Sequence, residues 1–528
     1  MAVYQLDKST AALSTMSKSQ LEQLPNVGKS IAAAIFEIST TGKYAELEKL
    51  LESTPKGVVE MLAIKGVGPK KIRTLWKEGQ IDSLLALKQA CTDGSILKFK
   101  GFGEKLVEEI IEYLNFKENS KGKFFYADVE ILSQKLEESL QNALAPIKVA
   151  LVGDVKRKME IGEKLSFIAG HTDATDIFSK INSLPDLNQD LADSSPFIWR
   201  GIVADSEIKV EIKVYDPKKF ESEKYLQSAG NGHLQHEING SSIRSFVKVN
   251  TFENEAEIFQ KLNLPPIPPE CREGLFEFNE PFPRLLEDSD LKGIFHNHTT
   301  YSDGEHTLQQ MADYCRELGY EYLGISDHSK TANYAGGLKE EDIIRQHKEI
   351  DELNSQMKPF KIFKGIESDI LGDGSLDYVP EVLATFDYIV ASIHANLKMD
   401  ADKATQRLIT AIENPYTTML GHPTGRLLLS RQGYPIHHSK VIDACAANKV
   451  IIEINANPWR LDLDWRWVHY ALEKGVILSI NPDAHEMAGY LDMHYGVCVG
   501  RKGGLTPEMT FNTWTLAQVE KYFGEKKY

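Results

Sequence analysis

Several features are scarce in this chain, and the lack of each one excludes a class of protein. No run of eighteen apolar residues occurs, so the sequence predicts no membrane-spanning helix and no membrane partner. Met1 to Lys8 contain no basic stretch that leads into an apolar one, so no secretory signal is expected. Only five cysteines occur among 528 residues, and they are widely separated, which is typical of free thiols. We therefore expect a cytoplasmic protein, and a monomer.

Positive charge is also scarce, but its distribution is uneven. The formal net charge is -16. Residues 1–125 hold 18 of the 60 basic and 15 of the 76 acidic residues, so the rest of the chain is strongly acidic. An acidic surface repels a polyanion. Any contact with nucleic acid is therefore expected in the N-terminal segment, and its affinity should depend strongly on salt.

Histidine, in contrast, is concentrated in one region, because twelve of the fifteen histidines follow residue 290. Nine His, Asp and Glu residues lie there at or just after apolar, β-branched segments, with helical stretches between them. Side chains placed repeatedly at strand ends indicate a barrel whose site lies at the C-terminal ends of its strands. These residues are His296, His298, Asp303, His328, Glu367, His394, His422, Asp483 and His485.

The residue types in this set indicate a metal site. Imidazole mixed with carboxylate is typical of Zn, Mn or Fe, and the lack of a nearby cysteine pair argues against a closed structural zinc. In a strand, His296 and His298 point to the same face and can bind one cation together. One histidine at a strand end is usually an ordinary polar residue, but nine such positions favour a metal centre.

A second pattern recurs three times in the N-terminal third, where glycines occupy a turn between two helical stretches. Glycine tolerates a positive φ, and its missing side chain lets a phosphate approach the amides of the next helix. The pattern predicts binding of the DNA backbone without reading of bases; an ordinary interhelical turn is the alternative. The predicted contacts are Asn26, Gly28, Lys29, Gly66, Gly68, Lys70, Lys71, Gly101, Gly103 and Lys105. Glu104 makes the third copy the weakest.

Three longer segments resemble one family. They read LPPIPPECRE at 264–273, GHPTGRLLL at 421–429 and EINANPWRLDLDWRW at 453–467. Together with the order of parts, they resemble the bacterial family X DNA polymerases that carry a C-terminal PHP (polymerase and histidinol phosphatase) domain. The resemblance covers almost the whole chain. It implies a multidomain α and α/β protein with an all-α helix-hairpin-helix region, an α+β nucleotidyltransferase palm with a thumb, and a distorted (β/α)7 barrel.

The resemblance also implies five regions along the chain. The expected boundaries are 1–80 for the helix-hairpin-helix domain, 81–140 for a helical fingers-like region with the third hairpin, 141–235 for the palm, 236–288 for the thumb and linker, and 289–528 for the PHP domain.

The palm departs from the family pattern. Family members hold two Mg²⁺ ions on three aspartates, but the matching positions here are Lys164, Ser166 and Glu211. Lysine cannot bind Mg²⁺, and one carboxylate cannot hold two such cations. We therefore expect no polymerase activity. Asp154 replaces a serine that faces the triphosphate. Ala34 stands where lyase-active members carry a Schiff-base lysine, so 5′-deoxyribose-phosphate lyase activity is not expected either.

The PHP pattern is complete, and the resemblance implies three divalent metal ions in it. The first ion would be held by His296, His298, Glu367 and Asp483, the second by Glu367 with His394 and His422, and the third by Asp303, His328 and His485. A carboxylate can bridge two ions, so Glu367 is a predicted catalytic residue. Arg426 is another, placed to neutralise phosphoryl charge, with a surface salt bridge as its alternative.

Several neighbouring residues have two interpretations. Asp327 is expected to orient a ligand histidine. Asn455 and Asn457 are expected to line the cleft, with capping of the next turn as the alternative. Trp459, Trp465 and Trp467 are expected to pack beneath the barrel rather than to stack on bases.

Two functions from different classes fit the sequence, and one of them is favoured. The favoured function is a metal-dependent phosphoesterase that acts on DNA ends, as a 3′–5′ exonuclease or 3′-end processing enzyme in repair. It uses both the hairpin turns and the metal centre. The alternatives are a small-molecule phosphatase of the histidinol-phosphatase type and a non-catalytic DNA-end binding protein.

Overall fold

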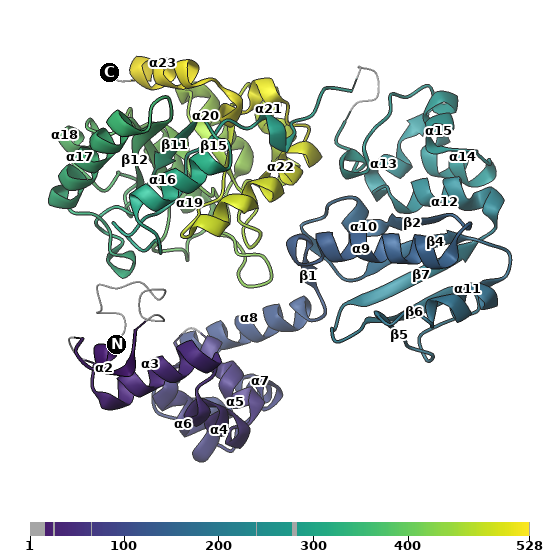
Figure 1. The fold of residues 1–528 in the computed structure, drawn as a ribbon, viewed down its shortest axis with the longest axis horizontal. Helices are drawn as coiled ribbons and strands as arrows, with labels where there is room; N and C mark the ends of the chain where they lie inside the picture. The colour runs from purple at the N-terminus through teal and green to yellow at the C-terminus, as the bar shows by residue number, and fades with distance from the viewer. Residues whose placement is uncertain (1–15, 25–26, 65, 239, 277–281, 527–528) are drawn as a thin grey trace. The chain divides into compact units, whose positions relative to one another are not determined.

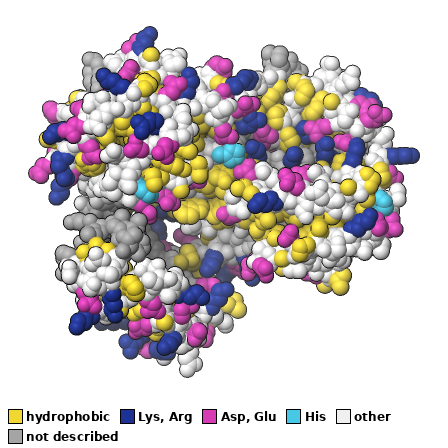
Figure 2. Space-filling view, viewed as in Figure 1, with side chains coloured by type: hydrophobic (Ala, Val, Ile, Leu, Met, Phe, Trp, Pro, Cys, Tyr) yellow, Lys and Arg dark blue, Asp and Glu magenta, His cyan; other side chains and the backbone are white. Residues whose placement is uncertain are grey.

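The computed structural model describes residues 16–528 apart from 25–26, 65, 239, 277–281 and 527–528 (Figure 1). The chain forms two compact units, Met1–Lys121 and Gly122–Tyr528. No helix in the described ranges combines the length and apolar character needed to cross a membrane. Acidic and basic side chains are intermixed over the face seen in Figure 2.

The first unit is helical. Its apolar residues recur at helical spacing, and those from Val58 to Leu114 form one buried core. The third hairpin therefore packs with the second, and the boundary predicted near residue 80 falls inside this core. The α-helices are α2 (Lys18–Leu21), α3 (Lys29–Thr41), α4 (Ala45–Ser53), α5 (Lys56–Glu60), α6 (Pro69–Lys77), α7 (Leu84–Thr92) and α8 (Glu104–Ser120).

The second unit begins with a five-stranded mixed sheet in the order β2-β4-β7-β6-β5. β4 and β7 are parallel, and the other neighbours are antiparallel. The strands are β2 (Val149–Val152), β4 (Leu165–Gly170), β5 (Leu187–Gln189), β6 (Ile198–Val203) and β7 (Lys209–Tyr215). The helices α9 (Tyr126–Leu144) and α11 (Ala174–Ile181) cover one face, where Trp199 is fully buried. The boundary predicted at residue 140 falls within α9. Short elements nearby are α10 (Gly153–Lys156), β1 (Phe124–Phe125) and β3 (Ile161–Gly162).

A small helical cluster follows the sheet. It contains α12 (Phe220–Gln227), α13 (Asn231–Gln235), the strands β8 (Glu237–Ile238) and β9 (Ser241–Ser242), α14 (Ile243–Val249) and α15 (Glu255–Leu262). Tyr225 and Phe259 pack in its core, and the buried Arg272 guanidinium lies over both rings. This cluster occupies the region where a thumb is predicted.

The C-terminal part is a parallel barrel of seven strands in sequential order, β10 to β16. A parallel bridge between Asn297 and Ala484 joins the two ends of the sheet. The strands are β10 (Gly293–Ile294), β11 (Tyr322–Ile325), β12 (Lys361–Asp369), β13 (Tyr388–Ser392), β14 (Met419–Leu420), β15 (Ile451–Asn455) and β16 (Leu478–Asn481). The helices are α16 (Leu308–Glu317), α17 (Glu340–Gln356), α18 (Pro380–Leu383), α19 (Ala401–Ile412), α20 (His438–Asn448), α21 (Trp465–Glu473), α22 (Met493–Lys502) and α23 (Leu516–Lys526). The predicted distorted (β/α)7 barrel is confirmed.

The two ends of the barrel differ in character. At the N-terminal ends of the strands, buried rings of Tyr322, Tyr388, Phe363, Phe511 and Phe523 pack together and fill the interior. The opposite end carries histidines and carboxylates. Because the apolar layer closes one end, polar chemistry is confined to the other.

Candidate functional site

The barrel brings all nine predicted metal ligands to the C-terminal ends of its strands. His296 and His298 follow β10, His328 follows β11, and Glu367 lies on β12. His394, His422 and the pair Asp483 and His485 follow β13, β14 and β16, while Asp303 comes from the loop after His298. Most of these side chains are buried. This clustering is what the spacing of the residues predicts.

Glu367 lies at the centre of the cluster. Its carboxylate oxygens are 3.3 Å from His296 Nε2, 2.9 Å from His328 Nδ1, 3.1 Å from His394 Nε2 and 3.0 Å from His422 Nε2. Burial opposes ionisation, but the imidazoles of His394, His296 and His328 outweigh it and hold the pKa of Glu367 well below its usual range. One carboxylate therefore lies within 3.3 Å of four imidazoles that come from four strand ends.

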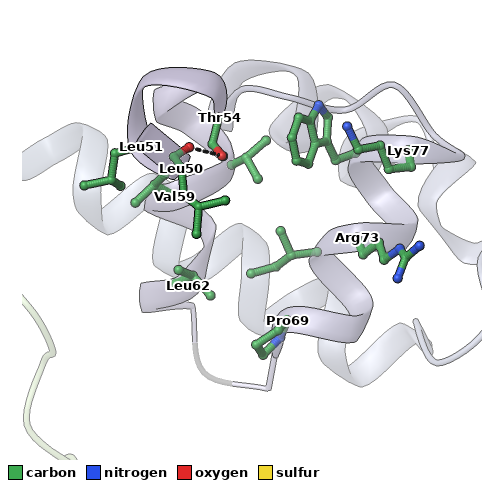
Figure 3. Close-up of a pocket in the computed structure, with 11 residues that line it drawn as sticks. Leu50, Leu51, Thr54, Val59, Leu62, Pro69, Arg73 and Lys77 are labelled. Atoms are coloured by element: carbon green, nitrogen blue, oxygen red, sulfur yellow. Dashed lines mark hydrogen bonds between the residues drawn. The ribbon is translucent and has the colours of Figure 1, made fainter. Parts of the chain in front are cut away.

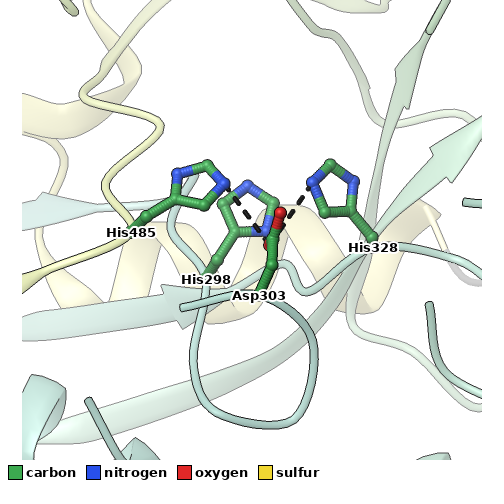
Figure 4. Close-up of side chains that lie close together, drawn as sticks. All are labelled: His298, Asp303, His328 and His485. Carbon is green, nitrogen blue, oxygen red and sulfur yellow. Dashed lines mark ion pairs between the residues drawn. The ribbon is translucent and has the colours of Figure 1, made fainter. Parts of the chain in front are cut away.

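A second group lies beside the first. His298, Asp303, His328 and His485 offer ligand atoms that all lie within 4.8 Å of one another (Figure 4). Asp303 Oδ1 is 3.6 Å from His328 Nε2 and 3.4 Å from His485 Nε2. His298 is also 3.0 Å from Asp483 Oδ1, so it lies between the groups expected for the first and third ions.

The donor set fits divalent cations. Within the described part of the chain, His298 Nδ1 and His422 Nδ1 are buried without a hydrogen-bond partner. Buried nitrogens without partners are costly unless another group, such as a cation, satisfies them. Imidazole nitrogens together with carboxylate oxygens are suitable ligands for Zn²⁺ or Mn²⁺.

Two supporting carboxylates were not predicted. Glu453 on β15 is fully buried; its Oε2 is 2.6 Å from His296 Nδ1, and its Oε1 accepts from the backbone N–H of His422. Asp369 Oδ1 is 2.6 Å from His394 Nδ1. Such partners fix the orientation of a ligand imidazole. The signals in the sequence are an acid inside an apolar strand and an acid two residues after Glu367.

Asp327 has a different role from the one predicted. Its buried carboxylate accepts hydrogen bonds from the backbone N–H and hydroxyl of Thr299, from the Ser302 hydroxyl and from the Gln346 amide. These contacts fix the loop that carries Asp303. Asp327 therefore positions a loop rather than a histidine ring.

Two arginines lie near the site. The Arg426 guanidinium donates to the Arg460 and Leu461 carbonyls and pairs with Asp464. These contacts favour the structural alternative for Arg426, because its donors hold the 460–464 loop. Arg460, which was not predicted, lies closer to the cluster, with Nε 3.5 Å from Asp483 Oδ2.

The asparagines and tryptophans divide between the site and the loop. Asn455 is buried and donates to Asp483 Oδ2, so it lies in the cluster, whereas Asn457 accepts from the backbone N–H of Trp459 and caps a turn. Trp465 is buried, as expected. Trp459 is 62% exposed, which corrects the prediction that it packs beneath the barrel. Its loop precedes α21, so it is not on the same helical face as Trp465.

The three glycine turns share one backbone geometry. Gly28, Gly68 and Gly103 are the residues directly before α3, α6 and α8, with φ of -82°, -77° and -96° and ψ of 172°, 172° and 165°. Gly66 and Gly101 have positive φ values of 83° and 93°, which favour glycine. A Cβ added at Gly28, Gly68 or Gly103 would meet no described atom within 4 Å. The space in front of each helix start is therefore open.

The predicted lysines surround these turns. Lys29, Lys70 and Lys105 are exposed near the starts of the three helices, and Lys71 Nζ donates to the Gly66 carbonyl. Asn26 lies outside the described residues. A shallow apolar pocket of about 580 Å³ lies nearby, between α4, α5 and α6 (Figure 3). Arg73 and Lys77 are the charged residues that line it.

The palm positions lie together but hold no second carboxylate. Ser166 on β4 and Arg200 on β6 are the register partners of Glu211 on β7. Lys164 Nζ is 2.7 Å and Arg200 Nε is 2.8 Å from the Glu211 carboxylate. Asp154 pairs with Arg157 at 2.5 Å. The basic side chains of Lys164 and Arg200 therefore surround the Glu211 carboxylate.

Comparisons with known proteins agree with this architecture. A SAM-like helix-hairpin-helix tandem model matches residues 58–115, and a PHP domain model matches residues 295–457. The DNA polymerase/3′-5′ exonuclease PolX of Bacillus subtilis (strain 168) is 32% identical over 98% of this chain and 93% of its own length. Probable phosphatases of Thermoanaerobacter sp. (strain X514) and Caldanaerobacter subterraneus are each 25% identical over 45% of this chain, which corresponds to 97% and 93% of their lengths. The full-length similarity, the hairpin tandem and the barrel together place the chain in the bacterial family X DNA polymerases that carry a C-terminal PHP domain.

Proposed function

We propose that this protein is a metal-dependent phosphoesterase that removes nucleotides or blocking groups from the 3′ ends of DNA, and that its polymerase activity is lost. The observation that carries the proposal is the contrast between two sites. The barrel gathers nine ligand-type side chains, Glu367 among them, whereas of the three predicted palm positions only Glu211 is a carboxylate, and it is held by basic side chains.

The barrel residues would hold the three divalent ions in the groups expected from the sequence, with Glu367 shared between two of them. Bound divalent cations would supply a water of lowered pKa and neutralise phosphoryl oxygens. The chain contributes the rest: Glu453 and Asp369 orient His296 and His394, and Asp327 fixes the loop of Asp303.

Two features favour a polynucleotide over a small phosphate ester. The hairpin turns present open helix starts with adjacent lysines, which suits backbone phosphates. The 62% exposed Trp459 precedes Arg460, whose Nε is 3.5 Å from Asp483 Oδ2, and the 72% exposed Tyr334 lies 6.2 Å from the His328 ring. Exposed rings suit stacking with unpaired bases. The relatives named probable phosphatases keep the small-molecule alternative open to test.

The deciding experiment compares two substrates. The protein with Mn²⁺ is incubated with a single strand labelled at its 5′ end and, in parallel, with histidinol phosphate. Progressive shortening from the 3′ end supports the proposal. Release of phosphate from histidinol phosphate, without any change in the strand, would support the small-molecule phosphatase instead.

Trp459→Ala should separate the strand from a small ester. Base stacking is worth about 1–3 kcal/mol per base, so we expect the KM for the single strand to rise about 5- to 100-fold. Hydrolysis of p-nitrophenyl phosphate should not change, because the ring does not contact the ligand cluster. Equal KM values for both variants on the strand would exclude stacking at this position.

Glu453→Gln tests the support of the ligands. Glutamine keeps the size of the side chain but removes the charge that faces His296 Nδ1. Loss of such a partner typically costs about 10- to 100-fold in metal affinity or activity, and we expect a loss in that range. Metal titration followed by activity measures it. Unchanged metal affinity would show that Glu453 only stabilises the fold.

Gly68→Ala tests the hairpin interface. With φ at -77° the alanine fits without strain, and only a small loss of unfolding free energy, about 0.5 kcal/mol, is expected from the poorer N-cap. Its methyl group would fill the open space, and loss of one phosphate contact worth about 1 kcal/mol should weaken DNA binding about fivefold. Gly524→Ala in α23 is the control. Fluorescence anisotropy that gives equal affinities for the two variants would contradict the interface.

A further inference from the structure

One face of the palm sheet collects basic side chains around a single acid. Lys209, Glu211 and Lys213 alternate along β7, so their side chains point to the same face. Arg200 on β6 is directly opposite Glu211, and Lys164 immediately precedes β4. Four basic residues from three neighbouring chain segments therefore share one face with one carboxylate.

The buried Glu211 carboxylate contacts three of these basic side chains. Its side chain is 5% exposed and contacts Lys164 Nζ at 2.7 Å, Arg200 Nε at 2.8 Å and Lys213 Nζ at 3.4 Å. Burial opposes ionisation, but the hydrogen bonds from Lys164 and Arg200 lower the pKa of Glu211 to about 2. The carboxylate is therefore ionised at neutral pH and holds three cations in fixed positions.

The cations are more exposed than the acid that holds them. The side chains of Lys164, Arg200 and Lys213 are 47%, 37% and 29% exposed. One negative charge cannot neutralise three positive charges, so the group keeps an excess of two. Arg200 Nε donates to the Glu211 carboxylate, and Nη1 donates to the Asp193 carbonyl. Among the described residues, the remaining nitrogen of this guanidinium, Nη2, has no hydrogen-bond partner.

The nearby acidic residue does not cancel this excess. The turn at Gly153 lies against Ser166, so the adjacent Asp154 is close to the group. Its carboxylate pairs with Arg157 at 2.5 Å, and Arg157 also contacts Glu273. In a chain of net charge -16, a fixed and exposed excess of positive charge is a local exception.

We propose that this face of the palm is an anion site that binds phosphate groups directly, without a divalent cation. The ligand chemistry is a phosphodiester or polyphosphate, presented by a DNA strand or by a nucleoside triphosphate. Positive side chains take the place of bound cations, so the palm retains phosphate binding while it lacks the carboxylates for transfer. This inference goes beyond the proposed hydrolysis and does not depend on the barrel.

The first test substitutes Lys164. Lys164→Gln leaves Arg200 and Lys213 to pair with Glu211, so the fold is retained. Binding of a fluorescent, phosphorothioate-protected single strand is measured by anisotropy with the full-length protein as purified, and again in EDTA. We expect about fivefold weaker binding and a salt slope reduced by about 0.7, the value for one single-strand phosphate contact. Lys180→Gln is the matched control, because Lys180 is 41% exposed and pairs with Asp176.

The second test removes the acid instead. Glu211→Gln leaves the three cations without their counter-charge, so phosphate binding should become about three- to tenfold tighter. A purely structural ion-pair cluster predicts the opposite, a lower melting temperature with no gain in binding. The melting temperature, followed by circular dichroism, reports whether the variant remains folded.

Competition identifies the source of the phosphate. Displacement of the strand by dATP and by tripolyphosphate in EDTA would assign a polyphosphate ligand, whereas resistance to both would assign the strand. Equal binding by the wild type, Lys164→Gln and Glu211→Gln would overturn the proposal. If EDTA abolished both the binding and the difference between the variants, the site would require a divalent cation, and the proposal would be overturned as well.

Discussion

Replacement of Glu367 with alanine should abolish hydrolysis of DNA ends. The carboxylate contacts four imidazoles from different strand ends, so its removal takes away the group that they share. Lewis-acid and nucleophile activation by bound cations is worth several kcal/mol, so a loss of about 1000-fold or more is expected. Shortening of a labelled single strand measures the rate, and elemental analysis of the purified variant should show reduced metal content.

The control for this variant is Glu473→Ala. Glu473 is an exposed glutamate on α21 that pairs with His469 at 3.3 Å, remote from the ligand set. It should retain wild-type activity and metal content. If the Glu367→Ala protein remained as active as the control, the barrel would not be the hydrolytic centre.

The second large effect is an absence of primer extension. With Mg²⁺ or Mn²⁺ and all four deoxynucleotides, extension should be at least about 10⁴-fold slower than that of a family member with a complete palm, because the two-cation clamp contributes several kcal/mol. The Bacillus subtilis relative, named a DNA polymerase, is the positive control. Extension by this protein that persists in the Glu367→Ala variant would contradict the loss of polymerase activity.

A double variant tests whether the missing carboxylates cause the absence of primer extension. Lys164→Asp with Ser166→Asp returns two carboxylates beside Glu211. Mn²⁺ binding at the palm, followed by electron paramagnetic resonance in a Glu367→Ala background, should rise relative to the parent. No gain would show that Arg200 and Lys213 alone exclude cations from this face.

The positions of most metal-ligand candidates could be predicted, because they lie at or just after an apolar strand and parallel strands align their C-terminal ends at one edge. Their supporting groups could not. An acid inside an apolar strand marks Glu453 as unusual, but only barrel closure shows that its side chain faces the ligands rather than outward. Trp459 was misjudged because its spacing from Trp465 looks helical, although α21 begins only at Trp465.

The domain boundaries illustrate a different limit. Composition does not change at residue 80, and the third hairpin is separated from the second by α7. Only the packed core from Val58 to Leu114 shows that the two hairpins form one body. The turn geometry at Gly66 and Gly101 could be predicted, because a positive φ favours glycine locally.

The aromatic layer at the N-terminal ends of the barrel strands limits where a substrate can enter and a product can leave. Tyr388 and Phe523 stack within the apolar layer that fills the barrel at the N-terminal ends of its strands. If the barrel shortens a strand as proposed, substrate must therefore enter and product must leave at the C-terminal ends of the strands, where the candidate ligands lie. We then expect released mononucleotide to inhibit hydrolysis competitively, and the rate of strand shortening with added mononucleotide tests this.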